Sequence, residues 1–156
     1  MLNELRDGVI TSLKQTGKSG ESKDGMDISL AAFDFEKGTM DWAGAYNPLF
    51  LYRKGEFIET KADKFPIGFG DMQKTFTNQH FDLQKGDTFY LFSDGYADQF
   101  GGSDGKKFMT KKFKKMFSEI QHLTMTEQKA FIEKALLEWM GEHEQVDDVL
   151  VIGIRV

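Results

Sequence analysis

Apolar residues recur at a helical period near both ends of the chain. We expect an amphipathic helix over residues 2–15, because one apolar set repeats there with charged residues between its members: Leu2, Leu5, Val9, Ile10 and Leu13. A second apolar set lines a lysine-rich helix: Phe108, Phe113, Met116, Phe117 and Ile120. Its lysines are interpreted as a solvated face that confers solubility. Thr124 and Glu127 have the spacing of a capping box and predict a further helix that ends at Gly141.

Short apolar runs separated by glycine-containing turns predict strands in the middle of the chain. The runs at 26–35 and 40–43 flank a turn and predict a hairpin. The runs at 49–52 and 57–59 predict a second hairpin, which we expect to continue the first as an antiparallel meander. Glycine-rich or proline-containing loops are expected at 17–25 and 63–71.

Two later runs predict strands close to the end of the chain. Residues 88–92 are apolar on both faces, as in a central, buried strand. Residues 149–152 form a last strand after an acidic pair. Helices at the ends and antiparallel strands between them indicate an α+β domain with helices packed on a sheet or sandwich.

Length and composition narrow the class of protein. A chain of 156 residues with 40% hydrophobic and 29% charged residues is expected to fold as one domain over residues 1–156. A net charge of -5 disfavours nucleic acid as a partner. The lack of cysteine excludes disulfides and thiolate zinc sites and is compatible with a cytoplasmic protein. No run is long enough for a membrane span, so we expect no membrane contact by this segment.

Common catalytic motifs are missing. Gly17-Lys18-Ser19 resembles the end of a phosphate-binding loop, but Ser12 stands where that loop requires glycine. Neither G-x-G-x-x-G nor G-x-S-x-G occurs. The three histidines are not spaced as metal pairs on a helix: His80, His122 and His143. Nucleotide binding through a Walker loop, serine-histidine catalysis and zinc chemistry are therefore disfavoured.

Carboxylates at strand ends are the strongest chemical signal. Asp94 follows the buried run 88–92, and Asp147 and Asp148 precede the last strand. If these strands are antiparallel neighbours, the carboxylates converge at one sheet edge, where Mg²⁺ or Mn²⁺ could bind. Taken alone, aspartates at such positions are more often simple turn formers. A calcium loop is weaker still, because the EF-hand spacing fails at Tyr96.

Five ordered segments resemble a known family. Residues 91–102 (LFSDGYADQFGG) and 145–152 (QVDDVLVI) are similar to the C-terminal motifs of SpoIIE/RsbU-type serine phosphatases, which belong to the PPM, or protein phosphatase 2C-like, family. Three more segments resemble its internal motifs in order: DGMDISL at 24–30, WAGAYNPL at 42–49 and FPIG at 65–68. The resemblance covers the whole chain.

The resemblance implies a fold, a reaction and roles for single residues. The fold is an antiparallel β-sandwich flanked by helices, with a two-metal Mn²⁺ or Mg²⁺ centre. The reaction is hydrolysis of phosphoserine or phosphothreonine in a phosphoprotein, such as an anti-sigma-factor antagonist, by metal-activated water. Asp94 and Asp147 match catalytic, metal-binding aspartates of the family. Gly95 gives the backbone room beside the cation, and Asp148 supports the loop.

One family motif does not occur. The D-x-x-G-H-G segment, whose aspartate bridges both metals, precedes the first helix in the family and is missing here. We therefore expect a partial phosphatase domain whose N-terminal part is absent and which binds metal weakly. The full-length protein could be attached to a membrane through regions outside this segment. The alternative is an inactive fragment or binding module, and we expect uncovered sheet edges to pair two copies into a homodimer.

Overall fold

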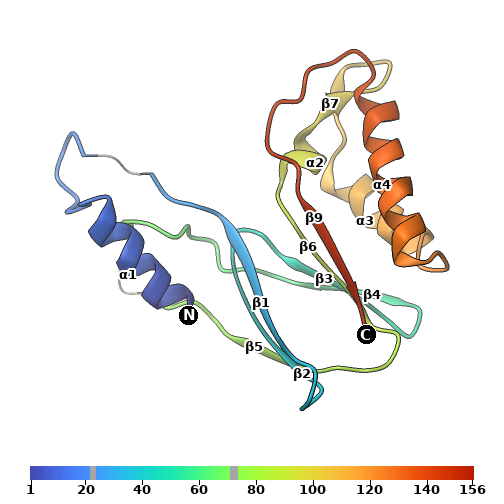
Figure 1. Cartoon of the computed structure of the whole chain (residues 1–156). Helices are drawn as coiled ribbons and strands as arrows, with labels where there is room; N and C mark the ends of the chain where they lie inside the picture. The colour runs from blue at the N-terminus through green and yellow to red at the C-terminus, as the bar shows by residue number, and fades with distance from the viewer. Residues whose placement is uncertain (22–23, 71–73) are drawn as a thin grey trace. The chain divides into compact units, whose positions relative to one another are not determined.

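A computed structural model describes residues 1–21, 24–70 and 74–156. The helices are α1 (Leu2–Ser12), α2 (Gly95–Asp98), α3 (Thr110–Glu119) and α4 (Met125–Met140). The strands are β1 (Ile28–Asp34), β2 (Thr39–Ala45), β3 (Leu49–Arg53), β4 (Glu56–Thr60), β5 (Gln79–Asp82), β6 (Thr88–Phe92), β7 (Phe100–Gly101), β8 (Lys106–Lys107) and β9 (Val151–Arg155). The expected α+β class with antiparallel sheets and helices is confirmed (Figure 1). Parts of the expected loops at 17–25 and 63–71 lie outside the described residues.

The chain folds as two compact units. The first comprises residues 1–50 and 59–85, and the second comprises residues 51–58 and 86–156. The first contains a three-stranded antiparallel sheet in the order β1-β2-β5. Its core includes Leu2 of α1, Ala43 and Ala45 of β2, and Phe76.

Helix α1 ends earlier than the apolar pattern predicts, and only part of the predicted apolar set, including Leu2 and Val9, packs on the core. Leu2 and Arg6 are its buried residues, whereas Leu5 and Leu13 are exposed. The buried arginine is stabilised because its guanidinium donates a hydrogen bond to the Lys74 carbonyl (2.8 Å) and lies over the Phe76 ring. An arginine stem can fill an apolar site when its head finds such partners.

The expected continuous meander is wrong. Strands β1 and β2 form the predicted hairpin, with Ile28 opposite Ala45 and Asp34 opposite Thr39. The other edge of β2 is occupied by β5, in which Asp82 lies opposite Thr39. Strand β3 therefore has no free edge of β2 to join, and it enters a second sheet in the order β4-β3-β6-β9.

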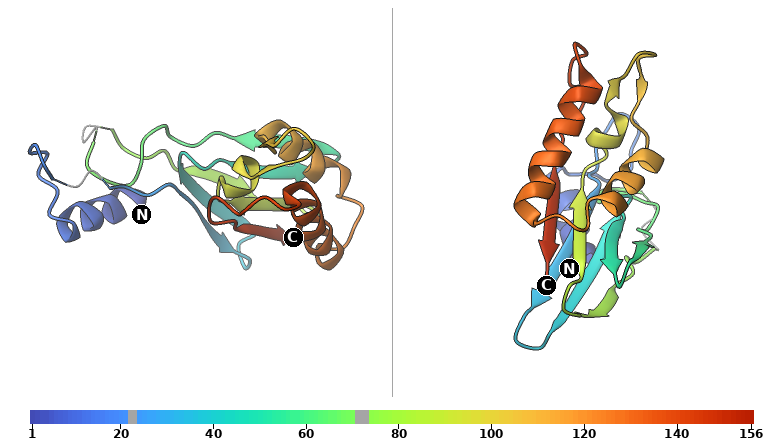
Figure 2. Two further views of the ribbon diagram at one scale, coloured as in Figure 1. Left: turned by 90° about the horizontal axis from the view of Figure 1, so that it is seen from above. Right: turned by 90° about the vertical axis from the view of Figure 1, so that its right-hand side faces the viewer.

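In the second unit, helices pack on one face of the neighbouring strands β6 and β9. Every residue of β6 is buried, as expected of a central strand. Tyr90 and Phe92 of β6 point to the same face and contact α3, with Tyr90 packed on Phe117 and Phe92 edge-on to Phe113. Both views in Figure 2 show α4 beside β9, which it contacts. No helix among the described residues has the length and hydrophobicity to cross a membrane.

Helix α4 has the predicted boundaries. The Thr124 hydroxyl accepts a hydrogen bond from the Glu127 backbone, and the Glu127 carboxylate accepts one from the Thr124 backbone (2.8 Å). The helix ends before Gly141, whose φ of 55° favours glycine. The sequence did not predict the two-stranded β7-β8 hairpin, which pairs Phe100 with Lys107.

Candidate functional site

The two acidic segments lie together at one edge of the four-stranded sheet. Strands β6 and β9 are antiparallel neighbours, with Phe92 opposite Val151. The strand adjacency on which the carboxylate argument depends is thus confirmed. Asp94 follows the end of β6 by two residues, and Asp147 precedes β9 by four. The two chain segments therefore leave the sheet from the same end.

Ser93 joins these segments directly. Its hydroxyl donates a hydrogen bond to the Asp148 carbonyl (2.6 Å) and accepts one from the Leu150 backbone N–H (2.9 Å). Its own N–H donates to the Leu150 carbonyl (3.1 Å). The sequence interpretation gave Ser93 no role, although its place directly before Asp94 was the available signal. A short hydroxyl side chain can bridge two backbones in this way because it both donates and accepts.

Gly95 allows the segments to approach closely. A Cβ atom at this position would lie less than 3.0 Å from the Asp148 carbonyl oxygen, a separation that Cβ atoms essentially never show. It would also lie 2.9 Å from the Asp148 carbonyl carbon. Gly95 is therefore required by the neighbouring backbone, and it provides room for the Asp147–Asp148 segment.

Asp94 stands on a firmly anchored element. It is the N-cap residue of α2, it is exposed, and none of the described residues donates a hydrogen bond to its carboxylate. The following turn is held by Tyr96, which is buried, stacks on Phe113 and donates a hydrogen bond to the Ile132 carbonyl (2.9 Å). Burial raises the pKa of Tyr96, which therefore stays a neutral donor. The Asp94 carboxylate is thus free on a rigid support.

Asp147 and Asp148 lie in the exposed loop before β9. One carboxylate oxygen of Asp147 accepts a hydrogen bond from the Asp148 backbone N–H (2.7 Å), and Gln145 donates from its side chain to the Asp147 carbonyl (2.7 Å). A shallow depression of about 330 Å³ is lined by Gln145, Val146, Asp147 and Asp148. The backbone carbonyl of Asp148 accepts the hydrogen bond from the Ser93 hydroxyl and so helps to hold this loop.

The ligand set available for a metal is incomplete. Exposed carboxylates suit a hard divalent cation, so the donor chemistry of Asp94 and Asp147 fits Mg²⁺ or Mn²⁺. Within residues 1–21, 24–70 and 74–156, however, no group of three or more His, Cys, Asp or Glu side chains could hold a metal ion. Asp98 and Asp104, the further acidic residues of the weaker calcium-loop hypothesis, form ion pairs with Lys107 (2.8 Å) and Lys106 (2.9 Å).

Solved structures of phosphatase domains share this fold. The PP2C domain of SiaA from Pseudomonas aeruginosa has a TM-score of 0.84 at 29% identity, over 99% of this chain and 59% of that one. The SpoIIE phosphatase domain from Bacillus subtilis, presoaked with Mn, has a TM-score of 0.60 at 13% identity, over 99% and 74%. RsbX, solved in complex with magnesium, has a TM-score of 0.56 at 15% identity, over 83% and 55%. The chain thus spans little more than half of the SiaA domain.

Sequence comparison identifies the family. No curated protein matches the chain with significant similarity. The model of the family described as stage II sporulation protein E (SpoIIE) matches residues 2–156. This match confirms the resemblance drawn from the five motifs and agrees with the fold of the structural relatives. The chain belongs to the SpoIIE family and has the fold of a PPM, or protein phosphatase 2C-like, phosphatase domain.

Proposed function

We propose that this chain supplies Asp94 and Asp147 as metal ligands of a Mn²⁺- or Mg²⁺-dependent protein serine/threonine phosphatase. The proposal rests on one observation. Hydrogen bonds of the Ser93 hydroxyl join the two acidic segments where the neighbouring strands β6 and β9 meet. Carboxylates fixed by two neighbouring backbones need little rearrangement to bind a cation, which lowers the entropic cost of binding.

The residues of the site have separate tasks in this proposal. The Asp94 carboxylate, which has no donor among the described residues, would bind a cation together with Asp147. Gly95 and the Asp148 backbone keep the two segments in contact. A divalent cation bound there would supply Lewis-acid activation of water and neutralise charge on phosphoryl oxygens.

Two carboxylates predict weak metal binding by this polypeptide alone. Affinity for hard cations depends on the number of charged ligands, and the D-x-x-G-H-G aspartate is not in this sequence. We therefore propose that turnover by this polypeptide is low or absent until a third carboxylate is supplied. The proposed substrate is a phosphoserine- or phosphothreonine-containing signalling protein in the cytoplasm, such as an anti-sigma-factor antagonist. The family match supports this substrate class.

Mn²⁺ titration followed by NMR tests the metal ligands. Paramagnetic Mn²⁺ should first broaden the backbone signals of residues 93–95 and 146–149, with an apparent Kd of about 10⁻³ M or weaker. Asp94→Asn and Asp147→Asn should each remove the local broadening. Asp104→Asn is the matched control, because Asp104 is an exposed aspartate of the same unit in a different loop.

The outcomes of the titration are decisive. Broadening centred elsewhere, or unchanged in both asparagine variants at 94 and 147, would contradict the proposed ligands. Tight binding of two ions would contradict the incomplete ligand set. In a parallel assay, any Mn²⁺-dependent hydrolysis of a phosphoserine peptide should disappear in Asp94→Asn, and full activity in that variant would refute its catalytic role.

A second candidate function is self-association through a sheet edge. In the described part of the chain, β9 pairs with β6 on one side and has no strand on the other. Ile152 within β9 is 44% exposed, and Leu150 just before it is 56% exposed. An open edge with apolar side chains is a template for pairing with another strand. We propose that two copies form a homodimer through β9.

Light scattering coupled to size-exclusion chromatography tests the dimer. The mass should be twice that of the 17.8 kDa chain, and Ile152→Lys should return the protein to a monomer, because charge on an edge strand blocks pairing. Phe35→Lys is the control, since Phe35 is exposed but lies outside β9. A monomer at all concentrations, or a dimer that survives Ile152→Lys, would refute pairing through this edge.

A further inference from the structure

A short basic segment stands out on an otherwise acidic protein. Residues 106–115 contain six of the 20 Lys and Arg residues and none of the 25 Asp and Glu residues. The chain as a whole has a net charge of -5. The structure divides this segment between the β7-β8 hairpin and the first turns of α3. The positive charge is therefore gathered in one region of the second unit.

Part of this segment lines a groove of about 680 Å³. The apolar lining comes from Trp139 of α4, from Phe100, which is 38% exposed, and from Met109, which is 58% exposed. The charged side chains of the lining are three lysines and one aspartate: Lys106, Lys107, Lys112 and Asp104. The groove thus combines an apolar floor with an excess of positive charge.

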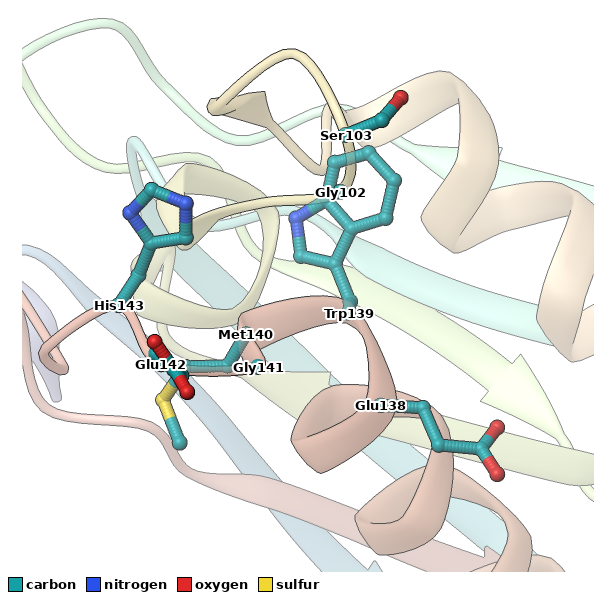
Figure 3. A pocket seen from close by; sticks show the side chains of 8 residues that line it. All are labelled: Gly102, Ser103, Glu138, Trp139, Met140, Gly141, Glu142 and His143. Atoms are coloured by element: carbon teal, nitrogen blue, oxygen red, sulfur yellow. The ribbon is translucent and has the colours of Figure 1, made fainter.

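Trp139 makes the wall of this groove rigid. Its indole N–H donates to the Gln99 carbonyl (3.0 Å), and its own carbonyl accepts from the Gly102 N–H (2.8 Å). A Cβ at Gly101 would collide with the Trp139 carbonyl oxygen. Figure 3 shows a second pocket, of about 490 Å³, in which Trp139 lies beside Gly102 and Ser103. Gly101 and Gly102 therefore allow the β7-β8 hairpin to pack closely on α4. These contacts fix the wall of the groove without any ligand.

Lys112 is the lysine best placed to receive a ligand carboxylate. Its Nζ lies 3.7 Å from the centroid of the Trp139 ring, and it has no carboxylate partner among the described residues. Lys106 and Lys107 are each paired with one aspartate at an exposed position. Such exposed pairs are weak and can exchange with a ligand carboxylate.

Met109 is held in the groove at a cost in backbone conformation. It has φ of 73°, which is uncommon for a residue with a side chain, and its N–H donates to the Ala97 carbonyl (2.7 Å). Backbone strain of this kind is concentrated at binding and catalytic sites. Here it presents a flexible thioether at the surface, and such side chains adapt to apolar partners.

We propose that this groove docks an acidic segment of a partner protein, with one large apolar side chain seated against Phe100, Met109 and Trp139. The carboxylates of the segment would face Lys112 and Lys107. A protein segment is favoured over an anionic membrane because the apolar residues line a concavity, which accepts an inserted side chain. The proposal does not depend on phosphatase activity. Along the sequence, only α2 and Gln99 separate the candidate metal ligand Asp94 from Phe100 of the groove.

Titration with a synthetic peptide tests the groove. The probe is the capped heptapeptide Asp-Glu-Asp-Phe-Asp-Glu-Asp, and the readout is the NMR signal of the Trp139 indole together with the backbone signals of residues 100–112. These signals should shift on titration. Lys112→Gln should weaken binding about fivefold. Replacing the phenylalanine of the probe by alanine should weaken it about tenfold or more. Added salt should weaken binding because it screens the charges.

Matched variants separate docking from general effects. Lys129→Gln removes an exposed lysine of α4 outside the groove and should leave the affinity unchanged. Met109→Gly removes the thioether, and glycine adopts this positive φ without strain, so the variant should stay folded and bind the peptide more weakly. Asp94→Asn should leave peptide binding intact, and Lys112→Gln should leave Mn²⁺ binding intact, so the two proposals fail separately.

Three results would overturn the docking proposal. One is the absence of shifts at millimolar probe. Another is an equal loss of affinity in Lys112→Gln and Lys129→Gln, which would indicate unspecific charge attraction. The last is binding of phosphatidylserine vesicles that requires Lys112, without any binding of the peptide, which would assign the groove to a membrane surface.

Discussion

The Gly95→Ala substitution tests how the two acidic segments are held together. The added methyl group would lie 2.9 Å from the Asp148 carbonyl carbon and 3.3 Å from the Asp147 carbonyl carbon, and closer still to the Asp148 oxygen. These are backbone atoms, so no side-chain rotation can relieve the contact. The 147–148 backbone must move by roughly half an ångström or more to reach an ordinary carbon contact.

The expected loss of stability is the balance of three effects. Overpacking a well-packed site costs about 1–3 kcal/mol. The displaced Asp148 carbonyl also loses the hydrogen bond from the Ser93 hydroxyl, which costs about 0.5–1.5 kcal/mol more. Alanine is a better helix former than glycine by at most about 1 kcal/mol, and by less at the first residue of the four-residue α2. We therefore expect a net destabilisation of roughly 2 kcal/mol.

Urea unfolding followed by circular dichroism measures this loss. Gly8→Ala is the matched control, because Gly8 lies inside α1 and a Cβ there would meet nothing within 4 Å. That variant should be more stable than the parent by about 0.5–1 kcal/mol. If Gly95→Ala unfolds at the same urea concentration as the parent, the close approach of the two segments does not exist in solution. Mn²⁺-induced broadening near residues 94 and 147 should also weaken in Gly95→Ala.

Three further predictions concern the hydroxyl link, a buried ion pair and a helix cap. Ser93→Ala should destabilise the protein by about 1–2 kcal/mol in urea unfolding, since two hydrogen bonds are lost, and Ser93→Thr should recover part of this. Asp87→Ala should cost about 2–3 kcal/mol, because it removes the buried carboxylate that Arg53 contacts at 2.9 and 2.6 Å; a loss below about 1 kcal/mol would contradict this. Hydrogen bonds from Thr124 lower the pKa of the Glu127 carboxyl below its ordinary value of 4.5. The carboxylate therefore stabilises the fold fully above pH 4.5, and this stabilisation is lost as the pH falls through the lowered pKa. The difference in thermal stability between the parent and Glu127→Gln should vanish in acid.

Local features of the structure follow from local sequence patterns. The buried strand β6, the hairpins β1-β2 and β3-β4, and the boundaries of α4 agree with the predictions. Each depends on neighbouring residues alone, either through apolar runs and turns or through the Thr124–Glu127 pair. The same holds for the family, because its motifs are contiguous stretches of residues.

Contacts between distant segments were not predictable in this way. The separation of β2 and β3 into two sheets depends on β5, which occupies the edge of β2 about thirty residues after β3. The buried Arg6 side chain hydrogen-bonds to the Lys74 carbonyl and lies over the Phe76 ring. No residue close to Arg6 in the sequence indicates these distant partners. The β7-β8 hairpin is too short for any periodicity to appear.

The candidate site shows the same division. The sequence singled out Asp94 and Asp147 as candidate carboxylates, since residue type and position at a strand end are local properties, and the family resemblance favoured them over simple turn formers. Only the tertiary structure decided how their segments meet, through the Ser93 hydroxyl and the glycine that lets the Asp148 backbone approach. It also decided that three lysines of the stretch interpreted from sequence as a solvated face, Lys106, Lys107 and Lys112, line a groove with Trp139. The physical reason is that a groove, or a hydrogen-bonded link such as that of Ser93, forms between two chain segments that the fold brings together. The periodicity of a sequence reflects only one segment at a time.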